Sequence, residues 1–263
     1  MERNTLKVMM ARQFATLDQF ILIENLPQYP VDLNTKAGQA IIKKFTGRFI
    51  EELSESYSEL ENALSNAQIN NIEEAKQCVV RYNVEVADAW HFLLEIIIYS
   101  GYDVYNIDGM LHKYISNNSG HLSNFYKENS PVETLLILGK YFNDHNALIT
   151  YPPGLFRIFT PGDLQLNPSC YGGNNLNMEA LKTHAYLLWE VTHTLNKLTN
   201  LLKNRAWKNS EPELNALGFE DGLTEVLLVW GAYLNYAGFT EQSILLAYKE
   251  KNDVVNERIK NGY

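Results

Sequence analysis

The stretch VEVADAWHFLLEIIIY, residues 84–99, decides the fold class of this chain. Nearly all of its side chains besides Glu85 and Asp88 are apolar, and a helix that is apolar on almost all sides is a buried one. Glu85 and Asp88 lie three positions apart, so their carboxylates share one face of a helix. The stretch therefore predicts a buried helix that carries two adjacent acids.

A second acidic segment, residues 51–55 (EELSE), contains Glu52 and Glu55 at the same spacing. Such a run is most often a solvated helix face, and Lys or Arg partners can also satisfy buried carboxylates. Two matched pairs on neighbouring helices instead indicate an oxygen cage, which suits a hard cation. We therefore predict a site for Mg²⁺, or for Mn²⁺, at Glu52, Glu55, Glu85 and Asp88.

Helical periodicity extends over most of the chain, and no long alternating strand pattern is present. Residues 130–133 (SPVE) form a capping box with Pro at the first helical position, and Thr240 is a second N-cap. Gly101 and Gly238 stand where helices are expected to end. These signals predict an all-α protein, a helical bundle with helices at about residues 5–23, 36–64, 71–99, 131–143, 176–204, 221–236 and 240–260.

Composition excludes several classes of protein. The formal charge of −9 argues against a nucleic-acid surface, which needs a basic stripe. No apolar run reaches the roughly 18 residues of a membrane span, and the start has no signal-peptide core. Cys78 and Cys170 form no disulfide framework and fit a reducing compartment. We expect a cytoplasmic protein with one domain over residues 1–263 and an insertion at about 100–180.

A degenerate internal repeat is a further hypothesis. Residues 225–230 (EVLLVW) align with residues 85–90 (EVADAW), and both segments run on to a Gly-aromatic pair. Leu228 then replaces Asp88, so the second copy would be structural. Chance similarity between two apolar helices explains the alignment equally well.

The chain ends in YKEKNDVVNERIKNGY, residues 248–263. Together with the two acidic segments, this end resembles the all-α nucleoside triphosphate pyrophosphatases, specifically the dimeric dUTPase group that includes the phage dCTPases. That family carries an E-E-x-x-E helix, an E-x-x-D-x-x-H-F helix and a C-terminal Y-x-x-K-N-x-x-N-x-x-R-x-x-x-G-Y segment. The matching residues are Glu51, Glu52, Glu55, Glu85, Asp88, His91, Phe92, Tyr248, Lys251, Asn252, Arg258, Gly262 and Tyr263.

Three departures from the family pattern affect residues that recognise the base, and none affects the residues that bind the metal. Val255 stands where the family has its second Asn, and Asn256 follows one place later. Residues 64–83 lack the tryptophans that help to enclose the base. Of the family's base-contacting residues in the first helix, only Gln13 and Leu17 have counterparts here.

The resemblance implies Mg²⁺-dependent hydrolysis of dUTP to dUMP and pyrophosphate by a homodimer. The alternatives are a dCTPase or broader dNTP pyrophosphatase and, from another class, a non-catalytic interaction protein that keeps only the fold. The resemblance also implies that the C-terminus closes over the phosphates. We expect no nucleic-acid partner and no membrane partner. The implied catalytic residues are Glu51, Glu52, Glu55, Glu85 and Asp88, and the implied substrate-binding residues are Gln13, Lys251, Asn252, Asn256, Arg258 and Tyr263.

Overall fold

The computed structural model describes residues 5–118, 129–145, 178–203 and 212–262. These residues form eight helices and no strand, so the prediction of an all-α protein is confirmed. None of these helices has the length and apolar character needed to cross a membrane. The helices are α1 (Thr5–Glu24), α2 (Lys36–Gln68), α3 (Ile72–Tyr99), α4 (Val104–Asn118), α6 (Pro131–His145), α7 (Met178–Leu201), α8 (Ala216–Tyr236) and α9 (Glu241–Lys260).

Each helix expected from the sequence is present, and α4 is an addition. It begins after Asp103, whose carboxylate accepts hydrogen bonds from the backbone N–H groups of Tyr105 and Asn106 at 2.9 Å each. Asp is a preferred N-cap residue, so Asp103 marks the start of a helix that the predicted set does not contain. The predicted helix stops are confirmed, because Gly101 and Gly238 adopt φ values of 84° and 79°.

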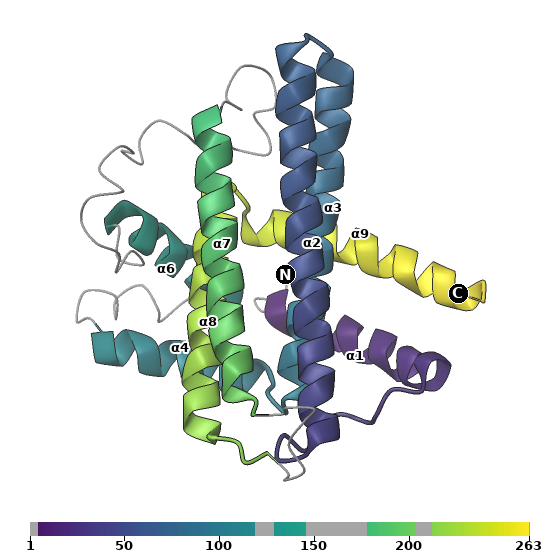
Figure 1. Ribbon diagram of the computed structural model, residues 1–263, viewed down its shortest axis with the longest axis vertical. Helices are drawn as coiled ribbons and strands as arrows, with labels where there is room; N and C mark the ends of the chain where they lie inside the picture. Colours follow the sequence, from purple (N-terminus) through teal and green to yellow (C-terminus); the bar gives the residue numbers. More distant parts are fainter. Residues whose placement is uncertain (1–4, 119–128, 146–177, 204–211, 263) are drawn as a thin grey trace.

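Two long helix pairs form the body of the molecule (Figure 1). The helices α2 and α3 lie side by side and are joined by a short turn, and α7 and α8 form the second pair. The helix α2 also packs on α7, which joins the pairs. The terminal helices α1 and α9 lie against each other and both contact α3. The second half of α3 is therefore covered by several helices, as its apolar sequence predicts.

The core contains two tryptophans that the repeat hypothesis makes equivalent. Trp90 of α3 and Trp230 of α8 pack edge to face with ring centroids 6.1 Å apart, and both are fully buried. Nearby, the hydroxyls of Tyr82 and Tyr233 form a hydrogen bond of 2.8 Å. Equivalent residues meet each other when they lie beside a twofold axis, so this contact favours the repeat, which stays a prediction.

Gly231 allows α6 and α8 to cross at close range. A Cβ atom at this position would lie 2.5 Å from the carbonyl oxygen of Leu135 in α6. We expect Gly231→Ala to lower the free energy of unfolding by about 1–3 kcal/mol, because the backbones must separate. Thermal unfolding measures the effect. Gly109→Ala in α4 is the matched control: its Cβ meets no atom within 4 Å, so it should be neutral or stabilising.

Candidate functional site

Three of the predicted metal ligands come together between α2 and α3. One carboxylate oxygen from each of Glu52, Glu85 and Asp88 lies within 4.8 Å of the others. Glu52 comes from α2 and the other two from α3, where their three-residue spacing places them on one face. The side-by-side packing of α2 and α3 brings that face against Glu52. All three residues are partly buried, so the fold holds three acids in a small volume with limited access to water.

This crowding favours the neutral form of each acid. Burial raises the pKa of Glu52 to about 8, and the charges of Asp88, Glu55 and Glu85 add to the shift. Burial, and then the charge of Asp88, raises the pKa of Glu85. Burial also raises the pKa of Asp88, although a hydrogen bond and the charge of Lys251 oppose that change. Burial is thus the main cause of the raised pKa values of all three acids.

Lys251 of α9 supplies the nearest positive charge. Its ammonium group forms an ion pair with Asp88, and the two side chains are only 18% and 15% exposed. The positive charge of Arg258 also lowers the pKa of Asp88. A cation from the C-terminal helix thus lies among the acids, where water screens it little.

The other two acids of the first motif lie outside this triad. Glu51 is exposed, and its carboxylate accepts a bond of 2.7 Å from Arg48, one turn earlier in α2. Glu55 is also exposed, yet its charge contributes to the raised pKa of Glu52. Of the four predicted carboxylates, the structure groups Glu52 with the α3 pair, and Glu55 lies beside this triad; the metal site itself stays a prediction.

A cavity of about 320 Å³ opens beside the triad and extends along α3. Asp88 and Glu95 both line it, and their seven-residue separation corresponds to about 10 Å along the helix axis. Aromatic and aliphatic side chains form much of the wall between them. The lining residues are Gln13, Thr16, Phe20, Glu24, Leu26, Lys44, Phe45, Arg48, Glu52, Asp88, His91, Phe92, Glu95, Lys251, Val255 and Arg258.

The far end of the cavity contains a chain of buried polar groups. The Tyr248 hydroxyl donates to Gln13 Oε1 at 2.7 Å, and Gln13 Nε2 donates to Glu95 Oε1 at 3.0 Å. The hydroxyl also lies 3.0 Å from the Met9 carbonyl oxygen. Burial raises the pKa of Glu95 to about 8, although the bond from Gln13 opposes that change. Glu95 is therefore predominantly neutral at pH 7.

His91 lies between the acids and this polar end. Its Nδ1 lies 2.8 Å from the carbonyl oxygen of Ala87, so Nδ1 carries the hydrogen and Nε2 is an acceptor. The ring stacks on Tyr248 with centroids 4.1 Å apart. Burial lowers the pKa of His91 to about 4, which keeps the ring neutral. Nε2 has no hydrogen-bond partner within the described part of the protein.

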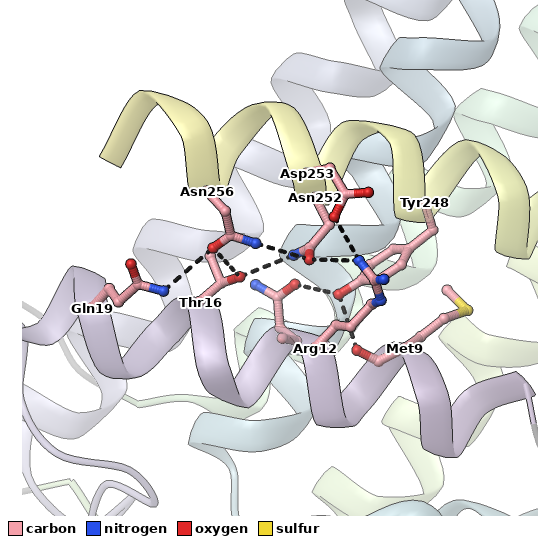
Figure 2. Close-up of polar contacts among 9 residues, drawn as sticks. Met9, Arg12, Thr16, Gln19, Tyr248, Asn252, Asp253 and Asn256 are labelled. Carbon is pink, nitrogen blue, oxygen red and sulfur yellow. Dashed lines mark hydrogen bonds and ion pairs between the residues drawn. The ribbon is translucent and has the colours of Figure 1, made fainter. Parts of the chain in front are cut away.

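The helix α9 is attached to α1 through residues that the sequence assigned to the substrate (Figure 2). Asn252 donates to the Thr16 hydroxyl at 2.9 Å, and Thr16 donates to Asn256 at 3.3 Å. Arg12 and Asp253 add an ion pair of 2.8 Å. Asn252 and Asn256 are not among the residues that line the cavity, and their side chains bond to α1; their substrate role stays a prediction.

The same contacts hold the C-terminal helix against α1. The helix α9 continues to Lys260, and Asn252 bonds it to Thr16 of α1; closure of this segment over phosphates stays a prediction. Val255, which replaces the family's second Asn, lines the cavity together with Lys251 and Arg258. Tyr263, assigned to the substrate from its motif, lies outside the described residues.

Sequence reasoning missed four charged residues of the cavity, Glu24, Lys44, Arg48 and Glu95. Glu95 follows Asp88 by seven residues, which returns to the same helix face, and it is an isolated acid in an apolar run. These two facts were sufficient to identify it. Lys44 and Arg48 precede the acidic segment of α2 by two turns and one turn, and nothing in their spacing distinguishes them from surface residues.

Comparison of the chain with protein-family models, with curated proteins and with solved structures gives no match.

Proposed function

We propose that this chain hydrolyses a deoxynucleoside triphosphate to the monophosphate and pyrophosphate, with Mg²⁺ bound by Glu52, Glu85 and Asp88. The cavity carries the proposal. It connects an acidic cluster with two nearby cations, Lys251 and Arg258, to an end lined by aromatic rings and buried polar groups. A triphosphate requires metal and cations around its anionic part, and a base requires flat apolar walls with a few polar groups.

The donor atoms of the triad support the proposal of a magnesium site. Its three carboxylates offer the oxygen ligands that hard cations prefer. Burial raises the pKa values of the three acids, a bound cation would lower them, and the ammonium of Lys251 already lies beside Asp88. Manganese, which accepts similar ligands, is the alternative metal.

The mechanism assigns separate roles to the acids and the cations. When bound, Mg²⁺ supplies a lowered pKa for a coordinated water and neutralises charge on the phosphates. Lys251 and Arg258 hold the phosphate oxygens, and the guanidinium can do so through two parallel hydrogen bonds. Glu55 takes the proton of the attacking water, because it lies beside the triad without belonging to it. Glu51 is the alternative general base for this step, although its carboxylate forms an ion pair with Arg48.

Attack of the water oxygen on phosphorus breaks one phosphoanhydride bond. The departing pyrophosphate carries away the electron pair of that bond, and the proton of the water remains on the carboxylate until solvent removes it. Water and one triphosphate thus yield one monophosphate and one pyrophosphate.

The proposed substrate is dUTP, supported by the resemblance of the three motifs to the dUTPase group. A dCTPase or a broader dNTP pyrophosphatase is the alternative, because Val255 and the absence of tryptophans in residues 64–83 change the base-binding part of the family pattern. The homodimer and the cytoplasmic location belong to the same proposal. A non-catalytic interaction protein would keep the helices and would need neither the triad nor its cations.

The test is a panel of dNTPs and UTP, assayed for pyrophosphate and monophosphate with Mg²⁺ and with EDTA. We expect kcat/KM for dUTP to exceed that for dTTP and UTP by about a hundredfold or more, because a buried polar site discriminates strongly. Chelation of the metal should abolish turnover. Faster hydrolysis of dCTP or of a purine triphosphate would replace dUTP as the substrate, and no hydrolysis of any nucleotide would favour the non-catalytic alternative.

A further inference from the structure

We propose that Glu95 is a base-binding residue that recognises the base as a neutral acid, donating a hydrogen bond from Oε2 to an acceptor atom of the base. This inference rests on the proposed function, since it concerns the same cavity. Glu95 belongs to none of the three sequence motifs, and the inference also specifies that its carboxyl group is protonated.

The position of the Glu95 carboxyl group is fixed by its neighbours. Oε1 accepts the hydrogen bond from Gln13 Nε2, while Gln13 Oε1 accepts from the Tyr248 hydroxyl. The Tyr248 donor thus fixes which way the Gln13 amide points. Gln13 is 1% exposed and Tyr248 is fully buried, so packing restricts both side chains. The carboxyl group is therefore held in one orientation before any ligand binds.

The second oxygen of Glu95 is buried and has no hydrogen-bond partner. The residue is only 6% exposed, and it lines the cavity. Leaving a buried polar atom unpaired is unfavourable, and such atoms in folded proteins usually have a partner. A ligand in the cavity would supply that partner, which makes Oε2 a position for recognition rather than a structural contact.

The groups that face Glu95 favour its neutral form. Besides Gln13, the titratable groups that influence it or surround the cavity near it are Glu24 of α1, Lys44 of α2, His91 and Tyr99 of α3, and Tyr248 of α9. Lys44 is the cation of this set, and its ammonium group is paired with Glu24 at 3.2 Å. No salt bridge to Glu95 is found in the part of the chain that the structure describes. Burial without a counter-ion keeps a carboxyl group protonated at neutral pH.

A protonated Glu95 and His91 together offer two different hydrogen-bonding groups. The acid donates from Oε2, and the neutral imidazole accepts at Nε2, which is also buried without a partner. Both residues lie one turn apart on α3 and line the same cavity. The pair is complementary to a base edge with an acceptor next to an N–H donor. Uracil offers a carbonyl oxygen beside its ring N–H, and cytosine offers its unprotonated ring nitrogen beside its amino group.

The experiment measures how binding of the non-hydrolysable α,β-imido analogue of dUTP changes with pH. Calorimetry with Mg²⁺ gives Kd at pH 7 and pH 9 for the wild type and for Glu95→Gln. Glutamine keeps a donor at this position and cannot titrate. With a pKa of about 8 for Glu95, the ratio of Kd at pH 9 to Kd at pH 7 should be about tenfold larger for the wild type than for the variant. Ionisation of the ligand affects both proteins equally and cancels in this comparison.

A second variant and a control test the role of the donor. Glu95→Ala should weaken binding at pH 7, and Glu95→Gln should recover most of that loss; circular dichroism verifies that both are folded. Glu250→Gln, an exposed acid on α9, should leave the pH ratio of the wild type unchanged. Equal pH ratios in the wild type and Glu95→Gln would overturn the inference while leaving dNTP hydrolysis intact. Failure of the wild type to bind the analogue at either pH would overturn the inference and the proposed function together.

Discussion

Replacing Asp88 with Asn is expected to lower Mg²⁺-dependent dNTP hydrolysis by about a hundredfold or more. Asp88 is the acid of the triad that contacts Lys251, and its α3 neighbour Glu85 shares its face of the helix. Asn keeps the size of the side chain but removes a charge that the metal requires. Metal stabilisation is worth several kcal/mol in the transition state, and each 1.36 kcal/mol corresponds to a factor of ten in rate. Steady-state kinetics with Mg²⁺ in excess measures the loss.

The control for this variant is Glu61→Gln, an exposed acid of α2 that lies outside the triad and does not line the cavity. It should retain wild-type kcat/KM. Circular dichroism should show the same helix content for both variants. Calorimetric titration should show weakened Mg²⁺ binding for Asp88→Asn alone. Full activity of Asp88→Asn, or undiminished activity in EDTA, would eliminate the triad as the metal site.

Replacing Arg258 with Ala should reduce kcat/KM by about a hundredfold as well, because it removes a cation from the end of the cavity that we propose binds the phosphates. Loss of one well-placed donor to the reacting group typically lowers turnover by about two to three orders of magnitude. Arg258 is exposed in the structure, so the melting temperature of the free protein should change little. Arg258→Lys should recover only part of the loss, because Lys cannot make the bidentate contact.

A truncation separates the roles within α9. Deleting residues 257–263 removes Arg258 but leaves the contact of Asn252 with Thr16, so the rest of α9 should stay attached to α1. The truncated protein should match Arg258→Ala in kcat/KM. Lys260 is an exposed cation in the last turn of α9, and Lys260→Ala should leave kcat/KM unchanged. Near-normal kcat/KM in the truncated protein would mean that the end of α9 has no part in the reaction.

Much of the fold was readable because helix formation depends on local information. The apolar run of residues 84–99 predicted a buried helix, and residues 86–99 of α3 are almost entirely buried. Thr240 forms the predicted N-cap of α9, and Gly101 and Gly238 end their helices with positive φ. These are properties of a few consecutive residues. The helix α4 was missed although its cap, Asp103, is equally local.

The candidate site could be predicted from the sequence only in part. Residue spacing predicts which side chains share a helix face, but it does not predict which residues of other helices contact that face. The pairing of Glu85 with Asp88 follows from α3 alone. Whether Glu52 or Glu55 turns toward that pair depends on how α2 is rotated against α3, which no pattern within either segment specifies. The packing turns Glu52 inward and leaves Glu55 exposed.

The sequence by itself determined most of the helices, their ends, the paired acids and the positions of Lys251 and Arg258 on the C-terminal helix, because each depends on neighbours along the chain. Tertiary structure decided which of these groups meet. Packing of α9 on α1 and α3 directs Lys251 to Asp88 and turns Asn252 toward Thr16. The same packing places Tyr248 and Gln13 beside Glu95. The Glu95 carboxyl group is therefore shielded from water without an ion-pair partner among the described residues. Contacts between helices that are far apart in sequence depend on packing angles and side-chain volumes across the whole core, and local periodicity does not encode them.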